Sequence, residues 1–199
     1  MVIMKGRERG FTLIELLVVI AILVVLSVTV VLVLNPAQLL AEGRDATRLS
    51  DMSTLNHAIA LWTANVINTS GTGGWPTSAT YRCTAGATKP GGASGCTYAS
   101  STKTDGTGWI PIDFGRISSG APLAKLPADP NNGGTCKGVT TTVCQYAFAA
   151  GTVAGVYELD AQVESVKFYS AAGTEVVTND EDGGNDNAVY ETGSNLTLF

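Results

Sequence analysis

The stretch Gly10-Phe11-Thr12-Leu13-Ile14-Glu15 opens an apolar run that continues to Leu34, and Glu15 is the one charged residue in that run. The 24 residues from Phe11 to Leu34 would form an α-helix roughly 36 Å long, which exceeds the roughly 30 Å of a bilayer's hydrocarbon core. Because lipid offers the backbone no hydrogen bonds, a single segment of this kind crosses a membrane as a helix. The sequence therefore predicts one membrane-spanning helix near the N-terminus.

Glu15 is costly in that setting, because an ionised carboxylate close to lipid needs a partner. The rest of the run contains no Lys, Arg or His, so the partner must come from the basic residues before it, from the membrane interface or from another molecule. A chain cut after Gly10 would give Phe11 a new α-amino group about one helical turn from Glu15. That amine could meet a carboxylate within one chain or between two chains.

These residues resemble the class III signal of type IV pilins and type II secretion pseudopilins. The resemblance covers Arg9 to about Leu26: a glycine, an aromatic residue, Thr-Leu, an aliphatic residue, a glutamate and an unbroken apolar run. It implies that a prepilin peptidase cuts between Gly10 and Phe11 and methylates the new amine of Phe11. It also implies that Glu15 pairs with the amine of a neighbouring subunit as a filament grows.

Two simpler kinds of N-terminal segment explain less of the pattern. An ordinary secretory signal has a shorter apolar core followed by a cleavage site of small residues, whereas this run is long and contains a single alanine, Ala21. An uncut signal anchor would account for the basic residues and for the span, but not for the spacing of Glu15 from a glycine. We therefore favour the pilin-like interpretation.

The charge distribution predicts the orientation in the membrane. Lys5, Arg7 and Arg9 precede the span, and the positive-inside rule keeps that side in the cytoplasm. Everything after Leu34 would then be exported. Loss of residues 1–10 would remove three positive charges and one negative charge, which takes the formal charge from −5 to −7. An acidic exported domain gives no support for electrostatic binding of nucleic acid, and we expect no specific nucleic-acid binding.

The four cysteines agree with export, because an even number of cysteines in an oxidising compartment predicts disulfides. Three pairings are open, and we expect the two local ones, Cys83–Cys96 and Cys136–Cys144. Each would stabilise the fold by about 2–3 kcal/mol. A zinc site has weaker support, because no C-x-x-C occurs and the chain has one histidine, His57.

A second helical segment is predicted after Asn35-Pro36, where proline would bend the helix because it lacks an N–H and clashes with the preceding turn. Apolar residues then recur every three or four positions, as in an amphipathic helix, at Leu39, Leu40, Leu49, Met52, Leu55, Ile59, Trp62 and Val66. The charged residues between them are predicted to lie on its polar side and to pair with one another: Arg44, Asp45, Arg48 and Asp51.

The remainder of the chain predicts a small exported head. Glycine, serine and threonine are abundant from Gly71 to Gly108, which indicates a long irregular connection with one short hairpin, held by a disulfide. The prolines of residues 122–130 predict an extended segment, and its Leu-Pro-x-Asp-Pro pattern is similar to segments of pseudopilin-like proteins. Alternating residues at 144–149 and 156–161 predict an antiparallel hairpin, and residues 163–169 a third strand.

The expected fold class is therefore α+β and pilin-like. It consists of a long N-terminal helix, half transmembrane and half amphipathic, packed on a small antiparallel β-sheet of three or four strands with extended loops. The expected segments are a leader at residues 1–10, a transmembrane or filament-core helix at 11–34, an amphipathic helix at 35–67 and the exported head at 68–199.

A glycine-containing acidic stretch at residues 178–187 is the second chemically suggestive feature. Calcium binds six to eight oxygens from carboxylates, amides and backbone carbonyls, which makes Asp180, Asp182, Asn185 and Asp186 candidate ligands. Some major pseudopilins hold calcium in a C-terminal loop, so the resemblance points the same way. An EF-hand is excluded, because Val189 stands where the bidentate glutamate belongs. A solvated acidic turn is the competing interpretation.

Two functions follow from the resemblance: a structural subunit of an extracellular type IV pilus-like filament, or a pseudopilin of a type II protein secretion system. Both imply a homo-oligomeric helical filament, a prepilin peptidase, an inner-membrane assembly platform and other minor pilins as partners. The chain would be a single-pass protein of the cytoplasmic (inner) membrane before assembly, and part of an extracellular or periplasmic filament afterwards. We do not expect an enzyme, because the chain has no nucleophile elbow and no H-E-x-x-H motif.

Overall fold

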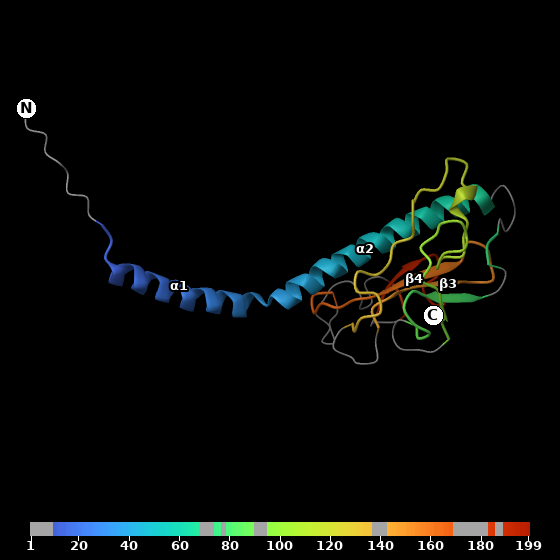
Figure 1. Cartoon of the computed structure of the whole chain (residues 1–199). Coiled ribbons are helices and arrows are strands. Elements are labelled where there is room, and N and C mark those ends of the chain that lie inside the picture. Colours follow the sequence, from blue (N-terminus) through green and yellow to red (C-terminus); the bar gives the residue numbers. More distant parts are fainter. Residues whose placement is uncertain are drawn as a thin grey trace, which may run out of the picture. The chain divides into compact units, whose positions relative to one another are not determined.

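The computed structural model describes residues 10–67, 74–76, 79–89, 95–136, 143–168, 183–185 and 189–199. The chain divides into two compact units, Met1–Leu39 and Leu40–Phe199. The first unit contains helix α1 (Leu13–Leu34), and the second contains most of helix α2 (Pro36–Trp62) together with one β-sheet (Figure 1). The α+β class predicted from the sequence is confirmed.

Both ends of α1 have a local chemical cause. At its start, Thr12 and Glu15 form a capping box: Glu15 N donates to Thr12 Oγ1 at 3.3 Å, and Thr12 N donates to Glu15 Oε2 at 2.9 Å. At its end, Asn35 adopts a left-handed conformation with φ 42°, and Pro36 opens α2, where its missing N–H is tolerated. The interruption that was predicted at Asn35-Pro36 is therefore present.

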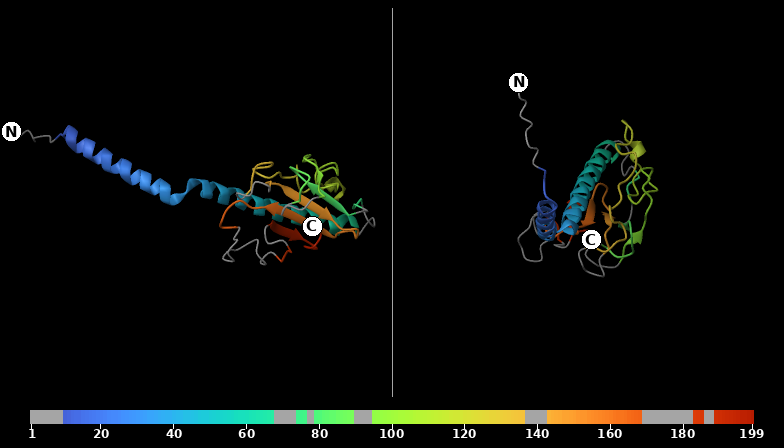
Figure 2. Two further views of the ribbon diagram at one scale, coloured as in Figure 1. Left: turned by 90° about the horizontal axis from the view of Figure 1, so that it is seen from below. Right: turned by 60° about the vertical axis from the view of Figure 1, so that its left-hand side comes forward.

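Helix α2 buries one face against the sheet, as its three- and four-residue spacing predicts (Figures 1 and 2). Met52, Leu55, Ile59 and Trp62 are fully buried, in one core with sheet residues such as Phe148. A π-helical turn, η1 (Thr63–Ile67), continues the helical segment to the last residue described before residue 74. Burial of four side chains of this size accounts for several kcal/mol of stability, at about 1.5–3 kcal/mol each.

Among the described residues, the sheet has five strands in the order β2-β1-β3-β4-β5. The strands are β1 (Thr80–Cys83), β2 (Thr97–Tyr98), β3 (Tyr146–Ala150), β4 (Tyr157–Gln162) and β5 (Val189–Gly193). The predicted antiparallel hairpin is the β3–β4 pair, and β5 continues the antiparallel ladder.

Three details of the predicted head are wrong. The sheet is mixed and not purely antiparallel, because β1 and β2 run parallel, so the connection after Gly71 forms no hairpin between them. The sheet contains five strands, against three or four predicted. Residues 163–168 form bends and turns in place of a third strand, because Glu164 and Ser165 donate their N–H groups to the Asp45 carboxylate on α2 and not to a neighbouring strand.

The two local cysteine pairs, Cys83–Cys96 and Cys136–Cys144, are disulfide-bonded. The first joins the end of β1 to the residue before β2, and the second closes the short excursion that precedes β3. Each therefore holds a loop end close to the sheet.

We expect replacement of Cys136 and Cys144 by serine to lower the free energy of unfolding by about 2.5 kcal/mol, and replacement of Cys83 and Cys96 by about 3 kcal/mol. The loop closed by Cys83–Cys96 is larger than the loop closed by Cys136–Cys144, because its cysteines are 13 residues apart and not 8. Its closure therefore removes more entropy from the unfolded chain. Denaturant unfolding of the two double variants measures both values. Equal stability of either variant and the native chain would show that its disulfide does not constrain the unfolded state.

Candidate functional site

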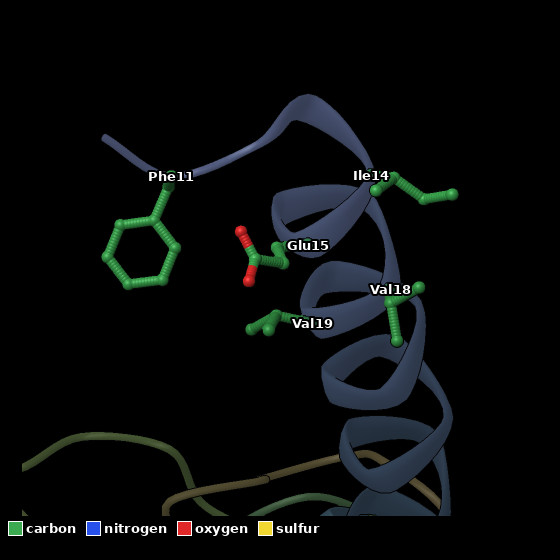
Figure 3. Close-up of a pocket in the computed structure, with 5 residues that line it drawn as sticks. All are labelled: Phe11, Ile14, Glu15, Val18 and Val19. Carbon is green, nitrogen blue, oxygen red and sulfur yellow. The ribbon is translucent and has the colours of Figure 1, made fainter. Parts of the chain in front are cut away.

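The residues singled out at the start of the sequence meet on one short surface of α1. A shallow hollow is lined by Phe11, Ile14, Glu15, Val18 and Val19. The Phe11 ring and the Glu15 carboxylate lie on the same side of the helix, with Val19 one turn beyond them (Figure 3). The Glu15 carboxylate thus lies within an apolar surface, next to Phe11. Cleavage after Gly10 would expose the backbone nitrogen of Phe11 as a new amine.

In the described part of the chain, the hydrogen bonds of the Glu15 side chain are with Thr12 of its own helix cap. Its Oε2 accepts from Thr12 N and from Thr12 Oγ1, at 2.9 and 2.8 Å. These bonds hold the side chain toward the N-terminal end of the helix, the direction from which a new amine would come. The cap therefore orients the carboxylate and leaves its second oxygen open to another group.

The apolar surface around Glu15 is exposed along the whole helix. No side chain of α1 is buried, and Phe11 is 89% exposed. Among the described residues, α1 is the one helix that is long and apolar enough to cross a membrane. A helix with this surface requires lipid or other apolar helices around it. Gly10 is described and exposed, whereas Lys5, Arg7 and Arg9 lie outside the described residues.

A second cluster of charged side chains joins the predicted charged residues of α2 to Asp129 and Glu164, which the sequence did not link to them. Arg48 is fully buried and binds three carboxylates: Asp45 at 2.7 Å, Asp129 at 2.7 and 2.8 Å, and Glu164 at 2.5 Å. Arg44 also pairs with Glu164. The predicted pairing of Asp45 with Arg48 is confirmed, but both side chains are buried, because the segments holding Asp129 and Glu164 cover this side of α2.

This network fixes α2 to two other parts of the head. Asp129 belongs to the proline-rich extended segment, and Glu164 follows β4. Asp45 also accepts the backbone N–H groups of Glu164 and Ser165, at 2.9 and 2.7 Å. Arg48 therefore has carboxylate partners on three segments, and a buried charge requires such partners. We infer that the network positions the head on α2.

The network also shifts the acid titration of Glu164. Burial raises the pKa of this carboxyl, but the hydrogen bonds and charges of Arg44 and Arg48 outweigh burial, and the net pKa lies below its ordinary value. As the pH falls, the unfolded chain therefore binds a proton at Glu164 before the folded chain does. The corresponding stability is complete above the ordinary glutamate pKa and is lost as the pH falls through the lowered one.

We expect the free energy of unfolding to fall less between about pH 7 and about pH 3.5 in Arg44→Ala than in the native chain. The reason is that the pKa of Glu164 in the folded variant then lies closer to its value in the unfolded chain. Denaturant unfolding of both proteins at the two pH values gives the difference directly. Lys167→Ala is the control, since Lys167 pairs with Glu42 at 3.9 Å on the surface. An unchanged pH dependence in Arg44→Ala would contradict the assignment.

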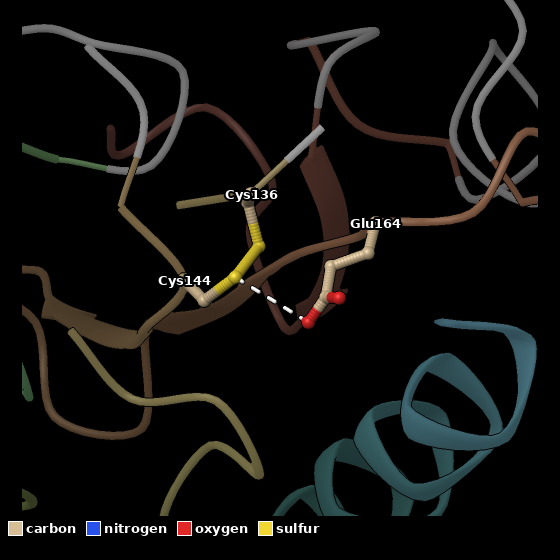
Figure 4. A group of neighbouring side chains, drawn as sticks. All are labelled: Cys136, Cys144 and Glu164. Atoms are coloured by element: carbon tan, nitrogen blue, oxygen red, sulfur yellow. Dashed lines mark hydrogen bonds between the residues drawn. A yellow bond between two sulfur atoms is a disulfide. The ribbon is translucent and has the colours of Figure 1, made fainter. Parts of the chain in front are cut away.

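The disulfide Cys136–Cys144 lies beside this network, and its Cys144 sulfur is 3.5 Å from Glu164 Oε1 (Figure 4). The proximity of two sulfurs and a carboxylate has the appearance of a metal site. Both sulfurs are in a disulfide, however, so neither is a thiolate that could bind a metal, nor a thiol that could donate to Glu164. The contact is therefore one of packing.

The candidate calcium ligands of the acidic stretch are only partly described. Asp180, Asp182 and Asp186 lie outside the described residues, whereas Asn185 lies within them. The side-chain amide of Asn185, oriented with its nitrogen toward the C-terminal segment and β5, donates to Leu196 O and to Glu191 Oε1, each at 2.9 Å. Asn185 thus contacts a carboxylate of β5 that the sequence did not indicate.

Comparison with known families agrees with the geometry of α1. Residues 5–31 match the family model described as the prokaryotic N-terminal methylation motif. This motif is the class III signal peptide of type IV pilins and pseudopilins, so the N-terminal segment is similar to the signal segment of that class of proteins. The match ends before the head. No curated protein and no solved structure matched the chain.

Proposed function

We propose that the protein is a structural subunit of an extracellular type IV pilus-like filament. In this proposal a prepilin peptidase cuts between Gly10 and Phe11 and methylates the Phe11 amine, and Glu15 then pairs with that amine of a neighbouring subunit. The supporting observation is the lone carboxylate of Glu15 on an exposed apolar helix, beside Phe11 and without a cation among the described residues around it.

Assembly explains the exposed helix as a transfer between two apolar environments. Before assembly α1 would lie in the cytoplasmic membrane, and afterwards among the same helices of other subunits. Because lipid and packed helices are similarly apolar, that transfer costs little for the aliphatic side chains, and Glu15 makes the difference. In the filament the Glu15 carboxylate would pair with a cation, a partner that it lacks in lipid. This pairing would favour the assembled state and would set the position of each incoming subunit.

The two disulfides and the polar loops that they hold favour a displayed pilus over a secretion pseudopilus. Cys83–Cys96 and Cys136–Cys144 both tie loop ends of the head to the sheet. Covalent closure of loops is useful for a surface that is exposed to the extracellular medium, where no chaperone repairs it. A pseudopilin of a type II secretion system is the alternative, and it shares the cleavage, the helix and the pairing of Glu15.

Coexpression of the chain with a prepilin peptidase and an assembly platform, followed by electron microscopy with a label on the head, tests this proposal. Labelled fibres that extend from the cell surface are the expected result. Processed protein that remains in the periplasm as short assemblies would favour the pseudopilin and overturn the displayed pilus. Processed protein that stays monomeric in the membrane would overturn both.

A further inference from the structure

One end of the head carries large apolar side chains that its core does not use. Val166 is 69% exposed and Leu40 is 66% exposed, although the neighbouring residues Ser165 and Ala41 are buried. All four belong to the compact unit Leu40–Phe199. A single exposed apolar side chain is common on proteins, so the position of these two and the groups around them decide whether they form a binding surface.

An ion pair places Lys167, the residue after Val166, next to the start of α2. Lys167 Nζ lies 3.9 Å from Glu42 Oε2, and Glu42 is two residues after Leu40. The Lys167 side chain is 58% exposed. An ammonium group has three N–H donors, so Lys167 can keep Glu42 as a partner and still bind a further anion.

A neighbouring ion pair fixes the same segment one turn further along the helix. Arg44 Nε donates to both carboxylate oxygens of Glu164, at 3.1 and 3.0 Å. Arg44 lies four residues after Leu40, and residues at this spacing share one side of a helix. The segment that includes Val166 is therefore held at the first turns of α2 within the head. We call the three exposed residues at this end the basal surface: Leu40, Val166 and Lys167.

The covalent chain keeps the basal surface close to the membrane in which α1 would lie before assembly. Helix α1 ends at Leu34 and α2 begins at Pro36. The two residues from Leu34 to Pro36 span at most about 7 Å, and the four helical residues from Pro36 to Leu40 add about 6 Å, so Leu40 lies within about 13 Å of Leu34 at any angle between the helices. The headgroup layer on each side of a bilayer is about 5–8 Å thick, so Leu40 would lie within this layer or directly above it.

We propose that the basal surface docks on the phospholipid headgroups of the membrane that holds α1, before the subunit enters a filament. The side chains of Leu40 and Val166 would enter the apolar boundary of the headgroup layer, and the Lys167 ammonium would bind a lipid phosphate. A second protein is a poorer partner, because a stable interface buries about 800 Å² on each side, far more than three side chains provide. The docking rests on the membrane stage of the proposed function, and it applies equally to a pilus subunit and to a pseudopilin.

The first test uses the full-length chain in nanodiscs of phosphatidylethanolamine and phosphatidylglycerol, with a photo-crosslinking residue at one position. On illumination Val166→benzoylphenylalanine should form covalent adducts with lipid, which mass spectrometry counts. Val153→benzoylphenylalanine is the matched control and should form few. Val153 is 65% exposed but shortly precedes Gly155, which lies beside Ile67 at the other end of the helical segment. No adducts from the Val166 probe, or equal yields from the two probes, would overturn the docking.

A probe on α1 separates failure of docking from failure of membrane anchoring. Val25→benzoylphenylalanine should give lipid adducts whenever α1 spans the bilayer. Adducts from the Val25 probe without adducts from the Val166 probe would overturn the docking and leave the membrane stage of the proposed function intact. The absence of adducts from both probes would overturn the membrane stage, and the docking with it.

A charge variant tests the contact of Lys167 with phosphate. Lys167→Gln, combined with the Val166 probe, should lower the ratio of docked to undocked heads, and with it the adduct yield, by about fivefold, because one basic residue at an anionic surface contributes about 1 kcal/mol. Lys125→Gln, at another exposed lysine, should leave the yield unchanged. Both variants should keep the native Tm, since Lys167 takes part in a surface pair only. An unchanged yield in Lys167→Gln would contradict the phosphate contact.

Discussion

Glu15→Ala should be cleaved and methylated normally yet form few or no filaments. The substitution leaves Gly10 and Phe11 intact for the peptidase, but it removes the carboxylate that would neutralise the neighbouring amine. Burying an unpaired charge within an apolar helix costs about 2.5–3.5 kcal/mol, which corresponds to a loss of about 100-fold in the affinity of a subunit for the growing end. Quantitative imaging of fibres, together with mass spectrometry of the N-terminus, measures the two properties separately.

Ser27→Ala is the matched control on the same helix. Ser27 Oγ donates to the Leu23 carbonyl within its own helix, so its loss should leave assembly unchanged. Glu15→Gln adds a further comparison, because glutamine keeps the size and polarity of the side chain but lacks the charge. Normal fibre numbers in Glu15→Ala or Glu15→Gln would show that the charge has no role in assembly.

Arg48→Met should destabilise the head by about 3–5 kcal/mol, because it leaves three carboxylates without the cation that they share. The methionine fills much of the volume, so the expected loss comes from uncompensated charge and not from a cavity. Denaturant unfolding of the full-length chain measures it. Glu15 and the disulfides are unaffected by this change, so cleavage of molecules that remain folded should be normal.

Lys125→Met is the control for that experiment. Lys125 is exposed, and its replacement should change the free energy of unfolding by less than about 0.5 kcal/mol. A loss below about 1 kcal/mol in Arg48→Met would contradict the view that the network positions the head on α2. The network around Arg48 would then be a set of mutually compensating charges with little influence on the stability of the head.

Helix α1 and the face of α2 that contacts the sheet could be predicted because local sequence determines them. The run that ends at Leu34 has no conformation other than a helix that satisfies its backbone in lipid, and Met52, Leu55 and Ile59 repeat at the helical period. The β3–β4 hairpin was also predictable, since both strands alternate and glycines connect them. In each case the information lies within about 30 residues of sequence.

The charged networks could not be predicted, because their members come from distant parts of the chain. Arg48 lies 81 residues before Asp129 and 116 residues before Glu164, and no local pattern links them. The Asp45–Arg48 spacing of three residues predicts a pair on the polar side of the helix, and it does not predict the segments that cover this pair. Similarly, the alternation of β4 suggests polar residues facing solvent, whereas Glu158 and Asp160 are both buried and the C-terminal residues Leu198 and Phe199 contact Glu158. In both cases the charged side chains are buried by distant segments, which the local sequence pattern does not reveal.

The central claim is that cleavage before Phe11 creates the amine that Glu15 neutralises in the neighbouring subunit. Mass analysis of the N-terminal peptide from purified, assembled material tests it most directly. We predict a peptide that begins at Phe11 and carries one methyl group on its α-amine. Assembled material in which Lys5, Arg7 and Arg9 remain attached to an uncut Gly10–Phe11 bond would contradict the account.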